Sequence, residues 1–361
     1  MRTNLSSQIS LNRVSTKYYK PENMIDRSVL TRFEKVPTNI YETMEEGAKA
    51  IADEIIRKVQ ERQREGKFCT IAAGTGASLR PLYAELVRRH KEEGVSFRNV
   101  VLFNLFEYYP LSEAKNGSMN QLNELFAKQV DIDAQNIFTM DGSIAQDAVI
   151  EHCSLYEQRI NTFGGLDMVL MGIGREGNIA MNEPGSTAAT STRLILIDAT
   201  SRAEAIHNTG IDNLPPCSIT MGVKTIMSAR KVYLLAWGEE KADIIKKAVE
   251  DKISDALPAS YLQMHQNASV CIDLTAAAHL TRIQRPWLVT NCDWNDKLIR
   301  SAIVWLCQLI NKPILKLTNK DYNEHGLSEL LALYGSAYNV NIKIFNDLPV
   351  SYTQLTLPTI A

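Results

Sequence analysis

Hydrophobic residues recur along most of this 361-residue chain with two different spacings, which alternate in order. Within residues 45–65 the apolar positions fall three or four residues apart, at Ala48, Ile51, Ile55 and Val59. That spacing lines one face of a helix. An unbroken apolar run then covers residues 68–73 and ends at a glycine, which is typical of a buried strand. A helix followed by a strand is therefore predicted here.

The same alternation continues to about residue 280. Further helices are predicted at 79–93, 145–163 and 239–250, and further strands at 100–104, 167–172, 193–198, 231–237 and 269–273. Strands separated by helices of this length form a mainly parallel sheet with helices on both faces. The predicted fold class is therefore α/β with a doubly wound sheet, and a ligand is expected beyond the carboxyl ends of its strands.

The two ends of the chain differ from this central part. Residues 1–40 show no clear period and are expected to form an N-terminal arm ahead of one domain at 41–280. Residues 281–348 are expected to form a small α/β extension. Its strands are predicted at 287–290, 313–317 and 341–345, and its helices at 294–309 and 327–334. Residues 349–361 carry no charge and resemble translated sequencing-adapter read-through, so we interpret them as a non-native tail. A disordered native tail is the alternative.

Composition and charge exclude several classes of function. The net charge is −2 and no basic block stands out, so binding to nucleic acid or to an anionic membrane is not expected. The N-terminus lacks the apolar core of a signal peptide, and no apolar stretch approaches the roughly 20 residues that cross a bilayer. The chain is therefore expected to be cytoplasmic. Its six cysteines form no CxxC pair, so buried thiols are expected and a metal site is not.

The first candidate for chemistry is the loop at residues 74–78, which lies between a predicted strand and a predicted helix. It consists of Gly74, Thr75, Gly76, Ala77 and Ser78. Glycines let backbone amides approach an anion closely, and a helix N-terminus favours negative charge. A phosphate site is therefore predicted, although a plain tight turn would also need glycine.

The second candidate is the polar, glycine-rich segment 172–186, which follows a predicted buried strand. Four of its side chains could converge on a polyhydroxy ligand at the carboxyl end of that strand: Glu176, Asn178, Asn182 and Glu183. An ordinary polar loop, with Glu183 solvated, is the alternative.

Two positively charged side chains complete the set of candidate functional residues. Arg193 begins a predicted strand, and Lys241 lies in the first turn of a predicted helix. A cation at that end of a helix opposes the helix dipole, and a bound phosphate would remove the conflict. Either residue alone is more often a surface charge.

Six segments follow one another in the order seen in the glucosamine-6-phosphate deaminase family, which the chain resembles over residues 41–280. They lie at 103–108, 172–186, 191–193, 219–223, 238–242 and 258–265. The related 6-phosphogluconolactonases share the fold but carry Ser-Leu-Phe-Pro where this chain has Asn-Glu-Pro-Gly at 182–185. The resemblance is therefore closer to the deaminases.

This resemblance implies a reaction and a set of roles. The family converts glucosamine 6-phosphate and water into fructose 6-phosphate and ammonia, with no metal or other cofactor. The loop at 74–78, Arg193 and Lys241 would hold the phosphate, and Glu183 would assist a histidine in opening the sugar ring. An aspartate would then move the C2 proton. The expected partner is the small sugar phosphate. The sequence leaves open whether the chain forms a homo-oligomer.

The chain departs from the family pattern at the groups that move protons. Phe106 stands where the family has the aspartate, and Asn178 stands where it has the histidine. Glu176 replaces a second aspartate, one methylene longer. Glu107 is adjacent to Phe106, but neighbours on an extended strand point to opposite sides. Losing one proton-transfer group typically costs about 10²–10⁴ in rate, so deamination is expected to be strongly impaired.

The expected function is therefore a deaminase-like protein of amino-sugar metabolism that binds a hexosamine 6-phosphate and deaminates it weakly. The alternative is a non-catalytic module that binds or senses sugar phosphates within a longer, truncated protein. A sugar-responsive transcription regulator is weaker still, because residues 1–40 are too short and too little patterned for a winged helix.

Overall fold

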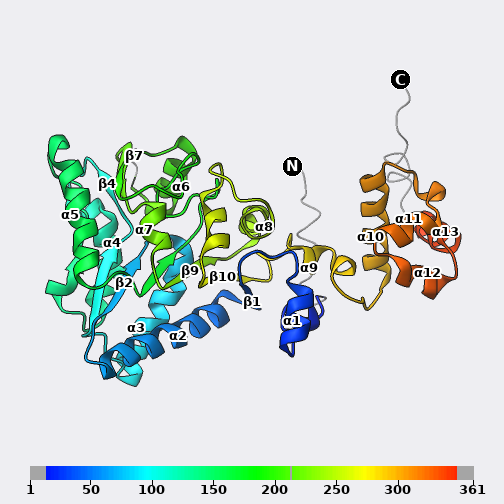
Figure 1. The fold of residues 1–361 in the computed structure, drawn as a ribbon, viewed down its shortest axis with the longest axis horizontal. Helices are drawn as coiled ribbons and strands as arrows, with labels where there is room; N and C mark the ends of the chain where they lie inside the picture. The colour runs from blue at the N-terminus through cyan, green and yellow to red at the C-terminus, as the bar shows by residue number, and fades with distance from the viewer. Residues whose placement is uncertain (1–13, 212–213, 348–361) are drawn as a thin grey trace. The chain divides into compact units, whose positions relative to one another are not determined.

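The computed structural model describes residues 14–211 and 214–347, which separate into two compact units. The first, called the sheet unit below, contains residues 34–279, and the second, the helical unit, contains 14–33 together with 280–347. Figure 1 shows the elements of both. The tail at 349–361 and the first 13 residues lie outside the described part.

The sheet unit is built on seven strands whose neighbours all run parallel. In spatial order they are β1 (Thr38–Tyr41), β10 (Ala268–Asp273), β9 (Lys231–Ala236), β6 (Met168–Met171), β2 (Cys69–Ala73), β3 (Val100–Asn104) and β5 (Ile137–Phe138). The predicted parallel α/β sheet is confirmed. Short β1 and β5 were not predicted because they carry too few residues to show a period.

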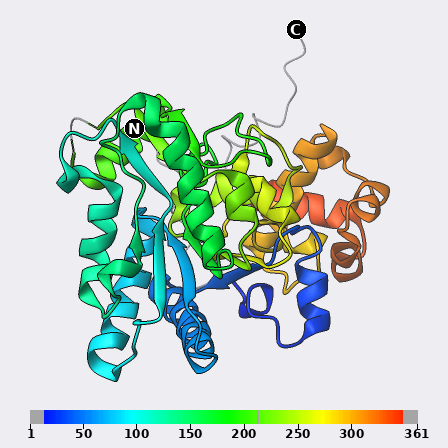
Figure 2. The same cartoon turned by 60° about the vertical axis from the view of Figure 1, so that its left-hand side comes forward.

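Helices cover both faces of this sheet. Three of them bury their apolar sides with alternate strand residues such as Leu102 in one cluster: α2 (Met44–Arg64), α3 (Arg80–Glu93) and α4 (Ser118–Leu125). In both ribbon views α2 and α3 lie on the same side of the sheet (Figure 1 and Figure 2). The next strand residue, Phe103, points to the other face, where its ring lies 5.4 Å from that of Tyr156 on α5 (Val149–Thr162). The alternation along β3 therefore serves two helical layers.

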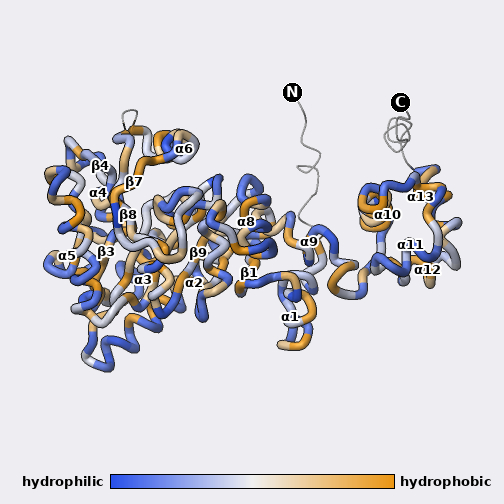
Figure 3. Tube along the Cα trace, turned by 45° about the horizontal axis from the view of Figure 1, so that its top comes forward, coloured by the Kyte–Doolittle hydropathy of each residue, from blue (hydrophilic) through white to orange (hydrophobic). Residues whose placement is uncertain are grey.

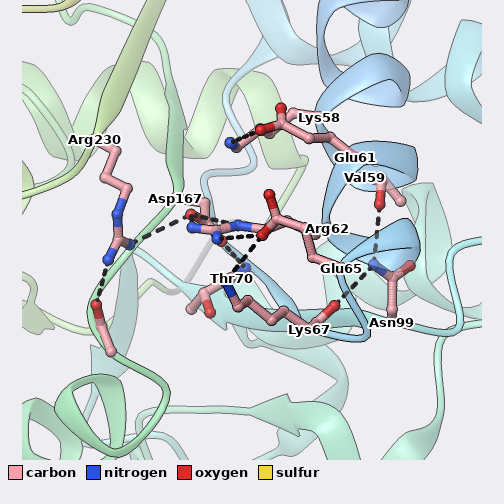
Figure 4. A network of polar contacts seen from close by, with 11 residues as sticks. Lys58, Val59, Glu61, Arg62, Glu65, Lys67, Thr70, Asn99, Asp167 and Arg230 are labelled. Atoms are coloured by element: carbon pink, nitrogen blue, oxygen red, sulfur yellow. Dashed lines mark hydrogen bonds and ion pairs between the residues drawn. The ribbon is translucent and has the colours of Figure 1, made fainter.

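A network of polar contacts fixes α2 at the amino end of the sheet (Figure 4). The buried carboxylate of Asp167, just before β6, accepts hydrogen bonds from the Nε and Nη2 atoms of Arg62 on α2. It also accepts from the Thr70 backbone N–H in β2 at 3.1 Å and from Arg230 at 3.3 Å. One side chain thus joins a helix to two strands.

The sheet unit also contains a smaller antiparallel sheet, whose spatial order is β4 (Phe106–Tyr109), β8 (Cys217–Thr220) and β7 (Arg193–Leu196). The strand predicted at 193–198 exists, but it belongs to this sheet and not to the parallel one. Its residues are half-buried, and Leu196 is 72% exposed, whereas strands of the parallel sheet are buried on both faces. The helix α6 (Ala199–Thr209) follows directly, capped by Asp198.

The helical unit contains α1 (Met24–Leu30), α9 (Thr281–Gln284), α10 (Asp296–Ile310), α11 (Asn319–Glu324), α12 (Ser328–Tyr334) and α13 (Ala337–Asp347). The strands predicted at 287–290, 313–317 and 341–345 are wrong: these segments lie in two short 3-10 helices and in α13. Ala337, Val340 and Ile344 have helical spacing and are buried in one core, and short apolar runs do not distinguish strand from helix. Hydrophobic and hydrophilic positions interleave along α10 and α13 (Figure 3).

No helix of the described residues is long and apolar enough to cross a membrane.

Candidate functional site

A cavity of about 460 Å³ lies at the carboxyl ends of the parallel strands of the sheet unit. The segments that follow β2, β3, β6 and β9 contribute to its lining, because parallel neighbours end at the same edge of a sheet. The cavity lies at the edge where a ligand was expected, and the binding itself stays a prediction. Additional lining residues come from α6, which closes part of the wall.

All five residues of the 74–78 loop line this cavity. The loop leaves β2 at Gly74, whose N–H donates to Leu170 and whose carbonyl accepts from the Tyr83 hydroxyl. In the described part of the chain, no hydrogen bond is donated by the backbone N–H groups of the other four residues. They precede α3, a helix of 14 residues. The result is a row of unpaired donors at a helix N-terminus, the usual composition of an anion site.

Phe106 lines the cavity and Glu107 does not. The ring of Phe106 packs edge-on against Tyr108 at 5.6 Å. The carboxylate of Glu107 is buried and accepts from the backbone N–H groups of Tyr108, Ser118 and Met119 at 2.6–2.9 Å. Burial raises its pKa, and the three N–H donors oppose that change. Glu107 therefore caps α4 and cannot act on a ligand in the cavity.

The 172–186 segment divides between the cavity and its surroundings. Asn178 is buried and lines the cavity, and its Oδ1 has no hydrogen-bond partner among the described residues. Glu176 is exposed and does not line it, so its carboxylate lies outside the cavity. The turn between them reverses at Gly177, whose φ is +78°. A left-handed residue at this position directs Asn178 inward and Glu176 outward.

Glu183 is half-buried outside the cavity lining. Its Oε2 accepts from the Ser201 hydroxyl at 2.9 Å, and its buried Oε1 has no partner within the described ranges. Burial raises the pKa of this carboxyl, with the Ser201 hydrogen bond acting in the opposite direction. Ser201 does line the cavity, so Glu183 lies directly behind the wall.

The two predicted phosphate cations are placed differently. Lys241 is buried and lines the same cavity as the loop at 74–78. Arg193 is absent from the lining of the described cavity, and its guanidinium donates to Asn182 at 2.9 Å and to Ser186 at 2.8 Å. The structure thus brings the loop and Lys241 together, while Arg193 and Asn182 fix the course of the 182–186 turn.

Lys241 has a counter-charge that the sequence did not reveal. Its Nζ lies 3.0 Å from Oε1 of Glu204 on α6 and 3.0 Å from the carbonyl oxygen of Ile173. His207, one helical turn after Glu204, also lines the cavity. A capping aspartate at 198 and a glycine at 210 delimit α6 in the sequence, but the pairing joins residues 37 positions apart and has no local signal.

Comparison with known proteins agrees with this geometry. The model of the family described as glucosamine-6-phosphate isomerases/6-phosphogluconolactonase matches residues 42–271. A glucosamine-6-phosphate deaminase of Bacillus velezensis is 36% identical over 239 residues, which cover 66% of this chain and 95% of that protein. The solved structure of a monomeric glucosamine-6-phosphate deaminase has a TM-score of 0.63 and 31% identity, covering 67% of this chain and 99% of that one.

A deaminase-like protein of Bacteroides thetaiotaomicron is similar over almost the whole chain. The two are 65% identical over 355 residues, which cover 98% of this chain and 54% of that protein. The chain therefore spans about half the length of this relative.

Proposed function

Because the chain belongs to the family of glucosamine-6-phosphate isomerases and 6-phosphogluconolactonases, we propose that its cavity binds a hexosamine 6-phosphate. The phosphate lies on the 74–78 loop beside Lys241, and the sugar extends toward Phe106 and Asn178. This assignment gives the protein a role in amino-sugar metabolism, the role that the names of its relatives suggest.

The unpaired N–H groups of residues 75–78 support this proposal most strongly. The N–H groups of the buried Thr75 and the half-buried Ser78 are costly to leave without a partner, and those of the exposed Gly76 and Ala77 lie beside them, so the loop favours an anionic ligand. Lys241 adds a buried positive charge at the same wall. Phosphate oxygens accept from both kinds of donor.

Deamination is proposed to be weak. Phenylalanine carries no proton, and asparagine is no general acid or base near neutral pH. Glu107 is engaged at α4 and Glu176 is exposed, so neither neighbouring carboxylate lies where it could compensate. The cavity therefore combines an anion site with a wall that lacks the family's two proton-transfer groups.

A non-catalytic module that binds or senses a sugar phosphate is the second candidate. The replacements at Phe106 and Asn178 favour it, because they remove chemistry without removing the donors of the loop. The two candidates differ in one observable quantity, the release of ammonia from bound glucosamine 6-phosphate.

The anion site is tested by changing a single N–H group. Gly76 has φ −57° and ψ 151°, a conformation that accepts a following proline, and residue 77 begins a 3-10 turn where proline is tolerated. Ala77→Pro removes one donor while keeping the backbone path. We expect it to weaken binding of glucosamine 6-phosphate about tenfold or more, the value of one hydrogen bond to a charged group.

Ala77→Ser keeps the N–H and is the matched control, and its dissociation constant should equal that of the unmodified chain. Unphosphorylated glucosamine should not raise the melting temperature. Equal affinity of Ala77→Pro and Ala77→Ser for the phosphorylated sugar would contradict the placement of the phosphate.

A further inference from the structure

The ammonium of Lys241 is already paired with an anion of the protein. Glu204 Oε1 lies 3.0 Å from its Nζ, and Glu204 Oε2 accepts from the backbone N–H of Arg175 at 3.3 Å. Both oxygens of this carboxylate are thus held by donors of the cavity wall. The side chain of Lys241 is 9% exposed and that of Glu204 is 21% exposed, so solvent screens the pair only in part.

Glu204 matters because it takes up a hydrogen-bond donor and the positive charge of the Lys241 ammonium. An ammonium has three N–H donors, and Glu204 and the Ile173 carbonyl use two of them. A phosphate at Lys241 would use the remaining donor and would draw on the same positive charge as Glu204. Two anions that share one buried ammonium repel each other, so Glu204 and a phosphate compete for it.

We propose that Glu204 acts as an internal anion that holds Lys241 until the phosphate of the ligand displaces it. This inference rests on the proposed function and names a residue that sets its affinity and specificity. Glu204 weakens the binding of every anion at this position. It discriminates most against singly charged anions, because a phosphate dianion competes better for the ammonium.

The test compares the unmodified chain with Glu204→Gln, in which the side chain keeps its size and loses its charge. Calorimetric titration with glucosamine 6-phosphate and with inorganic phosphate should give dissociation constants at least tenfold lower for Glu204→Gln. Without ligand this variant should melt at a lower temperature, because Lys241 loses its counter-charge, and phosphate should restore the loss.

Glu239→Gln is the matched control for charge. Glu239 is exposed, lies two residues before Lys241 and is not among the described lining residues. Removing the charge of Glu239 should change the dissociation constants for glucosamine 6-phosphate and for inorganic phosphate less than twofold. In the Glu204→Gln background, Lys241→Gln should abolish the gain in affinity.

Failures of the two proposals are distinguishable. Binding by the unmodified chain with no gain in Glu204→Gln would overturn the internal anion and leave the sugar-phosphate site intact. A gain that survives Lys241→Gln, or that Glu239→Gln equals, would overturn it as well. Absence of binding in every variant would overturn both the internal anion and the proposed function.

Discussion

At the scale of single residues, Phe106 and Glu107 show how one strand can keep a fold and change a site. Glu107 points away from the cavity and accepts from two N–H groups at the start of α4 and from that of Tyr108 in its own strand, so it serves the architecture. Phe106 points into the cavity, where its ring packs against Tyr108. A change at position 106 therefore changes what a ligand in the cavity would meet, whereas Glu107 preserves the structure of the wall.

Restoring the family residues at the two altered positions should restore some turnover. We expect the unmodified chain to release ammonia at least 10²-fold more slowly than the median enzyme rate near 10 s⁻¹. The double variant Phe106→Asp with Asn178→His should be measurably faster in an ammonia assay. Either single variant should recover much less, because ring opening and transfer of the C2 proton are successive steps. Rapid turnover by the unmodified chain would refute this prediction.

Glu183 should make stability depend on pH in a defined direction. Its pKa is raised in the folded protein, so its protonated form is favoured by folding. The corresponding stability is present below the ordinary Glu pKa of about 4.3 and is lost as the pH rises through the raised value. The unmodified chain should therefore lose stability relative to Glu183→Gln over the pH range above the ordinary Glu pKa of about 4.3. Urea unfolding at several pH values measures this difference, and a constant difference across that range would contradict it.

At the scale of secondary-structure elements, a buried carboxylate joins α2 to the amino end of the sheet. Asp167 joins Arg62 of α2 to Thr70 of β2, and Arg230 contributes from a half-exposed position (Figure 4). This network lies at the end of the strands opposite to the cavity. It can therefore be altered without touching the proposed binding site.

Asp167→Ala should lower the free energy of unfolding by about 2–3 kcal/mol, because Arg62 loses its buried partner and keeps only Glu65 at 3.2 Å. Arg230→Ala removes a partner whose side chain is 51% exposed, and it should cost about 1 kcal/mol or less. Chemical denaturation measures both values. Equal losses in the two variants would show that Asp167 is not the centre of the network.

The elements also differ in how far the sequence predicts them. The helix α2 and the strands β2, β3, β6 and β9 were predicted because long periodic stretches and buried apolar runs are strong local signals. The three strands predicted in the helical unit were wrong because short apolar runs fit either structure. The position of Lys241 at the cavity followed from a local motif. Its pairing with Glu204, and the separation of Arg193 from the cavity, depend on contacts across the fold and could not be predicted.

At the scale of the whole sheet unit, parallel strands bring loops that are distant in sequence to one edge, where they line one cavity. The anion donors come from the turn after β2, the cation from the turn after β9, and Asn178 from the segment after β6. These elements are held by the core and not by the ligand. The proposed phosphate donors and the positions expected to move protons therefore come from different loops, and we expect phosphate binding and proton transfer to be separable.

Isothermal titration of the unmodified chain with glucosamine 6-phosphate tests this separation most directly, because one trace reports both binding and turnover. We predict a saturable binding heat, with the signal returning to baseline after each injection or showing a residual turnover below about 0.1 s⁻¹. Sustained heat of reaction corresponding to a turnover near 10 s⁻¹ would contradict the loss of proton transfer. Absence of any binding heat would contradict the sugar-phosphate site itself.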